Sequence, residues 1–187
     1  MASIETSTGL TLSFDDPQPD QIDIEDIATG LSRACRFAGQ ASEFYSVAQH
    51  CCFVSDWIYS KTGSSSLALI GLLHDAPEAY CCDLPRALKY MLPDYKVIEN
   101  RVWGAISRKY LGEEVDFPPI IKEADNVALV TEARDFMGDP GWCKGEQWPP
   151  PAEWKIRPIG IRQAWVLYLQ KFYNLHSIVK EDAKTYA

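Results

Sequence analysis

Residues 67–75 read LALIGLLHD, an apolar run that ends in a histidine and an aspartate. Three serines, Ser64 to Ser66, precede the run and are typical N-cap residues, so the sequence predicts a helix over residues 67–74. Pro77 disfavours helical geometry at the residue before it. We therefore expect the helix to end or bend beside His74 and Asp75, which leaves an imidazole and a carboxylate at the buried end of an apolar helix.

This buried pair needs partners, because burying an unpaired polar or charged group costs several kcal/mol. A divalent metal ion is one partner that serves both groups. His50 shares the apolar stripe of another predicted helix with Val47 and Val54, and Asp125 can face the same interior from a third helix. Two imidazole nitrogens and two carboxylate oxygens suit Mn²⁺, Co²⁺, Fe²⁺ or Zn²⁺. From spacing alone, a satisfied core histidine beside a solvated aspartate remains the alternative.

The fold class follows from helical periodicity along most of the chain. Apolar residues recur at helical spacing in the ranges Ile24–Ser32, Phe44–Tyr59, Tyr95–Leu111 and Pro118–Met137. A chain of 187 residues suits one domain and can bury a full core without metal or disulfide staples. We predict a single compact, all-α domain of about six to eight helices.

Three further segments complete the chain: an N-terminal segment and a long loop that are not helical, and a last helix. Residues 1–20 contain turn signals and alternating apolar residues, which indicate a loop or short β-hairpin. Residues 138–158 are rich in glycine, proline and tryptophan and predict a long loop, which serves as a lid, a subunit contact or a buried brace. Residues 159–181 predict one long amphipathic helix, on which we interpret His176 as a structural residue.

Charge and composition exclude several classes of function. The net charge of −8 excludes a generally basic nucleic-acid coat and argues against a polybasic membrane binder. The N-terminal segment lacks the features of a signal peptide, and the longest apolar run is too short to span a bilayer. No CxxC pair occurs, so we expect buried, reduced thiols in a cytoplasmic protein. The six cysteines are Cys35, Cys51, Cys52, Cys81, Cys82 and Cys143.

The sequence also resembles a known family. His50, the adjacent His74 and Asp75, and Asp125 match the H…HD…D signature of the HD-domain phosphohydrolases. Residues 72–85, with LLHDAPEAY followed by DLP, resemble the bacterial 5′-deoxynucleotidases of that superfamily. The RFAG stretch that begins at Arg36 and the YSVAQH stretch that ends at His50 are closer still to the compact phage dATP triphosphohydrolases. The resemblance covers roughly residues 24–137.

The resemblance implies a metal site and a catalytic pair. The implied ligands of a divalent ion (Zn²⁺, Co²⁺ or Mn²⁺, with Mg²⁺ at a second site as an option) are His50, His74, Asp75 and Asp125. Glu78 would position or deprotonate the attacking water or hold a second metal ion; the alternative is an exposed carboxylate at a helix N-terminus. Asp83 would orient the nucleophile or contact the sugar. The alternative is that Asp83 is an N-cap residue before Leu84 and Pro85, and this is compatible with the functional role.

The resemblance also implies substrate contacts. Arg36 would contact phosphate, because its planar fork suits phosphate oxygens. Phe37 would stack on the base or pack in the core, and Gly39 belongs to the same substrate-binding stretch. Lys89 and Lys122 are candidates for the outer phosphates, with a solvated surface lysine as the alternative for each.

The implied activity is metal-dependent hydrolysis of a deoxynucleotide 5′ phosphoester, first of all dATP to deoxyadenosine and triphosphate. One alternative is a 5′-deoxynucleotidase that acts on monophosphates. Another is an inactive nucleotide-binding or interaction protein with a structural metal. The implied partners are the deoxynucleotide and further copies of the chain, as a dimer or hexamer, without polymeric nucleic acid or a membrane. One departure is Gln49, where the nucleotidase branch has a glutamate beside the first metal ligand.

Overall fold

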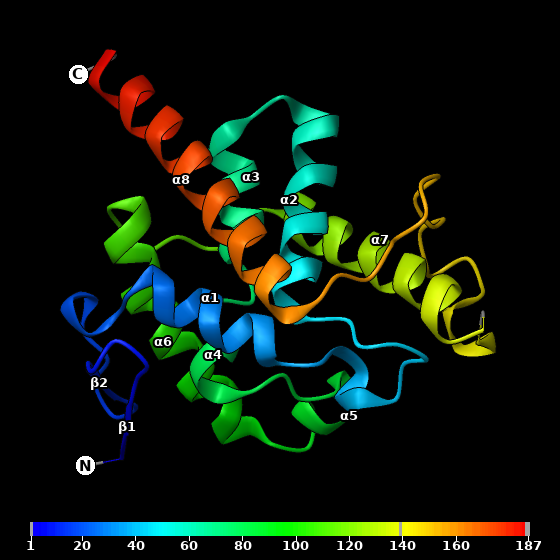
Figure 1. Ribbon diagram of the computed structural model, residues 1–187, viewed down its shortest axis with the longest axis horizontal. Coiled ribbons are helices and arrows are strands. Elements are labelled where there is room, and N and C mark those ends of the chain that lie inside the picture. Colours follow the sequence, from blue (N-terminus) through cyan, green and yellow to red (C-terminus); the bar gives the residue numbers. More distant parts are fainter. Residues whose placement is uncertain (1, 139, 186–187) are drawn as a thin grey trace.

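The computed structural model describes residues 2–138 and 140–185, and these residues form an all-α bundle, which confirms the predicted fold class (Figure 1). The helices are α1 (Ile24–Arg33), α2 (Val47–Thr62), α3 (Ser65–Leu73), α4 (Glu78–Cys81), α5 (Arg86–Lys89), α6 (Pro93–Leu111), α7 (Pro119–Phe136) and α8 (Ile161–Thr185). Short 3-10 turns occupy Pro19–Gln21, Arg36–Gly39 and Gly141–Cys143.

The N-terminal segment forms an antiparallel hairpin of β1 (Ser3–Glu5) and β2 (Thr11–Ser13), in which Ile4 faces Leu12. Asp26 of α1 attaches the hairpin turn to the bundle. Its carboxylate accepts hydrogen bonds from the Thr8 backbone N–H at 2.8 Å and from the Ser7 hydroxyl at 2.7 Å.

Serine caps set the boundaries of the two helices that lead to the site. Ser46 accepts a hydrogen bond from the Gln49 backbone, so α2 begins three residues later than the predicted start at Phe44. Ser64 caps α3 in the same way, and α3 ends at Leu73 with His74 as its C-cap residue. The expectation that this helix ends beside the His–Asp pair is confirmed.

Helix α2 lies at the centre of the bundle, where it packs against α1, α3, α7 and α8. Its buried residues join two apolar clusters: Ala48 and Cys51 pack with α1, α3 and α8, whereas Val54 and Ile58 pack with α7. Helix α8 crosses α1, α2 and α3, and its last turns extend beyond the other helices (Figure 1). The burial of α2 on several sides fixes the position of His50 at the end of its first turn.

The Trp-rich segment 138–158, of which residue 139 lies outside the described residues, is fastened at its C-terminal half to α7 and α2. The Ala152 backbone N–H donates to Thr131 Oγ1 at 2.9 Å, and Arg134 donates to the Ala152 carbonyl at 2.7 Å. The ring of Trp154 lies 5.5 Å from that of Phe53, measured between centroids. This half of the segment forms a brace, one of the three expected alternatives.

Three further sequence expectations can be compared with the structure. All six cysteines are free thiols, but only Cys51 and Cys52 are buried, so the expectation of buried thiols is wrong for the other four. Within the described ranges, no helix is both long and apolar enough to cross a membrane. His176 stacks on Phe172 at a centroid distance of 5.0 Å, and burial lowers the pKa of its imidazole, consistent with a structural residue.

Candidate metal centre and active site

The structure brings the four sequence-predicted metal ligands together from three helices. Helix α2 supplies His50, the end of α3 supplies His74 and Asp75, and α7 supplies Asp125. His50 Nε2 lies 3.4 Å from Asp75 Oδ2 and 3.6 Å from Asp125 Oδ1. His74 Nε2 lies 3.2 Å from Asp75 Oδ2. His50, His74 and Asp125 each offer a ligand atom within 4.8 Å of the others, so this cluster is placed to hold a metal ion.

The tautomers of both histidines favour such an ion. His74 Nδ1 donates to the Gly71 carbonyl at 2.8 Å, and His50 Nδ1 donates to Glu132 Oε1 at 2.5 Å. In the neutral form of either ring, Nε2 therefore presents a lone pair. Both Nε2 atoms are buried and have no hydrogen-bond partner in the described chain. These nitrogens face oxygens of Asp75 and Asp125. Because lone pairs on nitrogen and oxygen repel each other, a cation, either a proton or a metal ion, must lie between them.

The local charges agree with a cation site. Burial and Arg36 lower the pKa of His50, but Glu132 and Asp75 outweigh them and raise it to about 10. Burial raises the pKa of Asp125, but His50 and the other cations nearby lower it to about 2. The pKa of Asp75 also falls well below its usual range, since His74 and His50 outweigh its burial. The two aspartates are therefore anionic at neutral pH and attract a cation.

Glu132 is the site residue that the sequence analysis missed. Its side chain is fully buried, and its second oxygen, Oε2, accepts from Arg36 Nη2 at 3.1 Å. Glu132 follows Asp125 by two helical turns, so it lies on the same face of α7. That spacing, with a carboxylate among apolar residues, is the signal by which it could have been found. The carboxylate beside His50 is therefore Glu132, seven residues after Asp125. Gln49, the residue before His50, has an uncharged amide that instead donates to the Arg157 carbonyl at 2.7 Å.

Arg36 lies inside the protein rather than at an open phosphate site. Besides Glu132, its guanidinium faces Asp83 Oδ2 at 3.7 Å, and its side chain is 11% exposed. Burial of Arg36 lowers its pKa, but Glu132 and Asp83 outweigh this effect, so the side chain stays charged. Arg36 thus connects Glu132, which binds His50, to the carboxylate of Asp83.

Of the two predicted catalytic carboxylates, Glu78 begins α4 and Asp83 follows the end of that helix. Glu78 is buried at the start of α4, not exposed at a helix N-terminus, and its Oε2 has no hydrogen-bond partner among the residues described. Burial, with Asp75 and Asp83 nearby, raises the pKa of Glu78 well above its usual range, although Lys89 opposes this shift. Burial also raises the pKa of Asp83. Glu78 therefore holds a proton more readily than an ordinary carboxyl group does.

Lys89 is held by carboxylates and does not face an open phosphate site. Its ammonium lies 2.6 Å from Glu78 Oε1 and 2.7 Å from Glu99 Oε1. Burial lowers the pKa of Lys89, but Glu78 outweighs it and raises the pKa far above the usual value. The expectation that Lys89 binds an outer phosphate therefore has no support from its contacts, and the geometry makes Lys89 a positioning residue for Glu78.

Strained backbone lies next to Arg36 and Asp83. Within the described ranges, Phe37, Ala38 and Cys82 are the non-glycine residues with positive φ, at 56°, 50° and 71°. Such conformations cost about 1–3 kcal/mol each and concentrate at functional sites. Phe37 is half-buried, and its ring lies 5.6 Å from the Arg36 guanidinium. Gly39 continues the left-handed run at φ 77° in an exposed turn with open space around it, so the structure gives it a backbone role only.

Two cations flank the outer side of Asp125. Lys122 Nζ lies 2.8 Å from Asp125 Oδ2, and Arg86 Nη2 lies 3.1 Å from the same oxygen. Both are partly exposed, and Trp148 covers the Arg86 guanidinium at 5.8 Å from the ring centroid. Arg86 was not among the sequence-predicted residues. It follows the DLP stretch directly, and that adjacency is the signal by which it could have been found.

Cys51 also borders the cluster, with its sulfur within 4.8 Å of ligand atoms of His74 and Asp75. Burial, and then Asp75, raise the pKa of this thiol well above its usual range. A neutral thiol is a poor metal ligand. The histidines and aspartates therefore remain the candidate ligands.

The fold and the site define an all-helical protein with a buried cluster of histidines and carboxylates that is placed to hold a metal ion. No protein-family model matches the chain. The chain is 37% identical over 186 residues to the uncharacterized protein YfdR of Escherichia coli (strain K12), covering 96% of this chain and 99% of YfdR. It is 33% identical over 140 residues to an uncharacterized protein of Rhodobacter capsulatus, covering 70% of this chain and 71% of that protein. The chain belongs to the same family as YfdR.

Proposed function

We propose that this protein is a hydrolase of deoxynucleotide 5′ phosphoesters that depends on a divalent ion, with dATP as the first candidate substrate. The observation that carries the proposal is the convergence of two unpartnered, buried imidazole nitrogens on two anionic aspartates. The resemblance of these residues to the HD-domain phosphohydrolases supplies the reaction class. His50, His74, Asp75 and Asp125 would hold Zn²⁺, Co²⁺ or Mn²⁺.

The bound ion would supply Lewis acidity and a water of lowered pKa. Glu78 would accept the proton of the attacking water through its unpartnered Oε2, because burial and neighbouring carboxylates raise its pKa and make it a stronger base than an ordinary carboxylate. Lys89, on the other oxygen, would hold this carboxylate in place. Asp83, fixed by Arg36, would orient the water or contact the sugar.

The substrate phosphates would approach from the side of Arg86 and Lys122. Both cations face Asp125 from the partly exposed side and can turn toward phosphate oxygens without breaking the core. The half-buried ring of Phe37, beside Arg36, is the candidate for stacking on the base. Arg86 and Lys122 would thus supply the positive charge that a nucleotide with more than one phosphate needs.

One observation favours the second candidate, a 5′-deoxynucleotidase for monophosphates. Lys89 is engaged by Glu78 and Glu99, which removes one of the two lysines assigned to the outer phosphates. A triphosphate then relies on Arg86 and Lys122. Both reactions break the same 5′ ester. The two activities therefore differ in how much positive charge the protein places beyond the ester phosphorus to bind further phosphates.

The test is product analysis by chromatography. The chelator-stripped protein is given each deoxynucleoside triphosphate and monophosphate, with Zn²⁺, Co²⁺, Mn²⁺ or Mg²⁺ added back. Deoxyadenosine and intact triphosphate from dATP would support the leading proposal, and phosphate release from monophosphates alone would support the second. Absence of turnover with every metal would overturn both and leave the nucleotide-binding or interaction protein with a structural metal.

Two variants separate catalysis from metal binding. His74→Ala should abolish both metal binding and turnover. Glu78→Gln should cut turnover by about 10²-fold or more while it spares metal binding, since it removes the proton acceptor and keeps the side chain's shape. Glu113→Gln, at an exposed position outside the helices, is the matched control. Normal turnover in Glu78→Gln would exclude the proposed proton acceptor.

A further inference from the structure

The first nine residues of α6, Pro93–Arg101, lie outside the apolar core, yet one of their faces is covered. Burial in α6 begins only at Val102. Before that residue, Tyr95, Ile98 and Glu99 are half-buried and the rest are exposed. Spacings of three and four residues place these three side chains on the same face of a helix. The hydrogen bonds of Tyr95 and Glu99 show what this face contacts.

Tyr95 holds the backbone at the end of α4. Its hydroxyl donates to the Cys82 carbonyl at 2.6 Å. Cys82 has φ 71° and ψ 149°, at the edge of a region that glycine alone usually occupies, and a residue in such a region relaxes unless its surroundings hold it. Asp83 follows directly, and its carboxylate faces Arg36 at 3.7 Å. The bend at Cys82 therefore sets the direction of the Asp83 side chain.

Glu99 holds Lys89, the residue that contacts the other candidate catalytic carboxylate. The Lys89 ammonium lies 2.7 Å from Glu99 Oε1, 2.6 Å from Glu78 Oε1 and 5.4 Å from the centroid of the Tyr95 ring. All four residues of α5 (Arg86–Lys89) are exposed or half-buried, and a helix of one turn is not stable by itself. The position of Lys89 therefore depends on its polar partners.

The Lys89–Glu99 pair differs from an ordinary ion pair on a protein surface. Exposed pairs contribute about 0–1 kcal/mol, and many have no measurable effect. Here the side chains of Lys89 and Glu99 are 24% and 17% exposed, and Lys89 is shared with Glu78, which is 3% exposed. A change at Glu99 is therefore transmitted to a buried carboxylate of the candidate site.

We propose that Tyr95 and Glu99 of α6 are positioning residues for the two catalytic carboxylates: Tyr95 fixes Asp83 through the Cys82 carbonyl, and Glu99 fixes Glu78 through Lys89. This inference rests on the proposed hydrolase function. It extends the site onto a fourth long helix, beyond α2, α3 and α7. Such positioning matters because a displacement of about 1 Å at a reacting group can cost about 10²-fold in rate.

Steady-state kinetics test the proposal. Glu99→Gln and Tyr95→Phe should each lower kcat about tenfold, since each loosens one carboxylate without removing it. Metal affinity, measured by competition with a chromophoric chelator, should stay unchanged. In Glu99→Gln, KM should stay within about twofold, because Glu99 reaches the site only through a lysine that carboxylates hold. A thermal melt verifies that each variant is folded. Wild-type kcat in both variants overturns the proposal.

Two further variants distinguish positioning from a general structural role. Tyr95→Leu loses the ring beside Lys89 as well as the hydroxyl, so its kcat should fall further than that of Tyr95→Phe. Cys82→Gly permits a positive φ without steric cost, so it should recover part of the kcat lost in Tyr95→Phe. An equal loss with and without Cys82→Gly would overturn the role of the Cys82 conformation.

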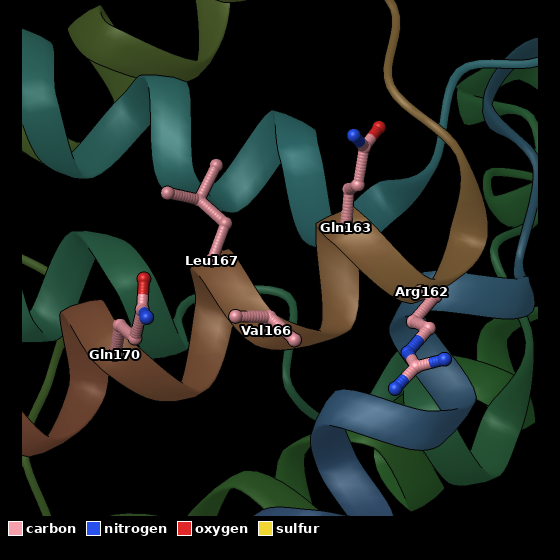
Figure 2. A pocket seen from close by; sticks show the side chains of 5 residues that line it. All are labelled: Arg162, Gln163, Val166, Leu167 and Gln170. Atoms are coloured by element: carbon pink, nitrogen blue, oxygen red, sulfur yellow. The ribbon is translucent and has the colours of Figure 1, made fainter.

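Three controls match these substitutions. Asp94→Asn removes a carboxylate from an exposed position in the first turn of α6. Tyr90→Phe removes a hydroxyl from a side chain that is 83% exposed. Gln170→Ala changes an exposed residue on another helix, at the shallow hollow on α8 that Figure 2 shows. All three should keep the kcat of the wild type.

Amide hydrogen exchange over residues 82–89 gives a readout that needs no activity. Tyr95→Phe and Glu99→Gln should each speed exchange in this segment about tenfold, because fewer contacts then hold it closed, whereas the controls should not. Wild-type exchange in both variants overturns the hold of α6 on this segment. Absence of turnover in the wild type overturns the proposed function instead, and exchange then still decides whether Tyr95 and Glu99 fix the segment.

Discussion

Glu132 accepts the Nδ1–H of His50 at 2.5 Å, although 82 residues separate the two in the chain. This hydrogen bond orients the ring so that Nε2 of His50 faces Asp75 and Asp125. The same carboxylate holds Arg36, which in turn reaches Asp83. One buried glutamate on α7 thus links the candidate metal ligands to a candidate catalytic carboxylate.

Glu132→Gln should weaken divalent-ion binding by about 10–100-fold, because a carboxylate that orients a ligating histidine typically contributes that much. Competition with a chromophoric chelator measures the affinity. Glu123→Gln, on the exposed side of the same helix, is the control and should bind as the wild type does. An unchanged affinity in Glu132→Gln would mean that His50 keeps its orientation without the carboxylate, and the assigned role would be wrong.

Loading with a divalent ion should stabilise the fold. A ligand present at about 100 times its dissociation constant stabilises by about 2.7 kcal/mol, which raises the melting temperature of a domain of this size by about 5–10 °C. Removal of the ion with a chelator should reverse the rise. Asp125→Asn should lose most of it, whereas Asp116→Asn, at an exposed position, should keep it. A rise that is equal in both variants would place the ion elsewhere.

Arg86→Ala should raise KM for phosphate substrates about tenfold, the effect of one lost charge-assisted contact to a phosphate. Metal affinity should not fall, because Arg86 faces Asp125 Oδ2 while Oδ1 faces His50. Steady-state kinetics and the chelator competition give the two readouts. Arg101→Ala, exposed on α6, serves as the control. A loss of metal affinity with KM unchanged would instead make Arg86 a support of Asp125.

The sequence predicted most of what local patterns determine. Helical spacing and serine caps located the long helices, and the HD pair at the end of the apolar run at residues 67–75 located two ligands. The error at the start of α2 is local as well, because Ser46 caps the helix and α2 begins at Val47, not at Phe44. Segment 138–158 left three alternatives open. Hydrogen bonds from α7 made its C-terminal half a brace, and no local pattern encodes those contacts.

The parts of the site that were not predicted depend on contacts between distant segments. Glu132 and Arg36 form their ion pair across 96 residues, so neither sequence neighbourhood shows that the other is near. Lys89 was assigned to phosphate because it follows the DLP stretch at residues 83–85, with a solvated surface lysine as the alternative, yet Glu78 and Glu99 hold it. A charge's partner is set by packing, and a single sequence records only the residue type.

Gly30→Ala should lower turnover with little effect on metal affinity. A Cβ at Gly30 of α1 would lie 2.6 Å from the carbonyl oxygen of Ala79, which neighbours Glu78 in α4. Helix propensity alone would favour alanine by about 1 kcal/mol, but overpacking against backbone costs about 1–3 kcal/mol, so the clash should dominate and displace α4. Gly160→Ala, with open space at its Cβ, is the control. Turnover equal to the wild type would show that α4 absorbs the shift without moving Glu78.

Asp26→Asn should destabilise the protein at neutral pH by about 1–3 kcal/mol, because charge-assisted hydrogen bonds from Ser7 and Thr8 are lost. Burial raises the pKa of Asp26, but these hydrogen bonds outweigh it and leave the pKa below the usual 3.8. A carboxyl whose pKa falls on folding stabilises the folded state above its unfolded pKa and loses that contribution as the pH drops through its folded pKa. The difference between the wild type and Asp26→Asn should therefore be full at pH 7 and shrink below about pH 4. Urea unfolding at both pH values measures it, with Asp20→Asn, in the 3-10 turn Pro19–Gln21, as the control. A difference that is independent of pH would show that the side chain's shape, and not its charge, attaches the hairpin to α1.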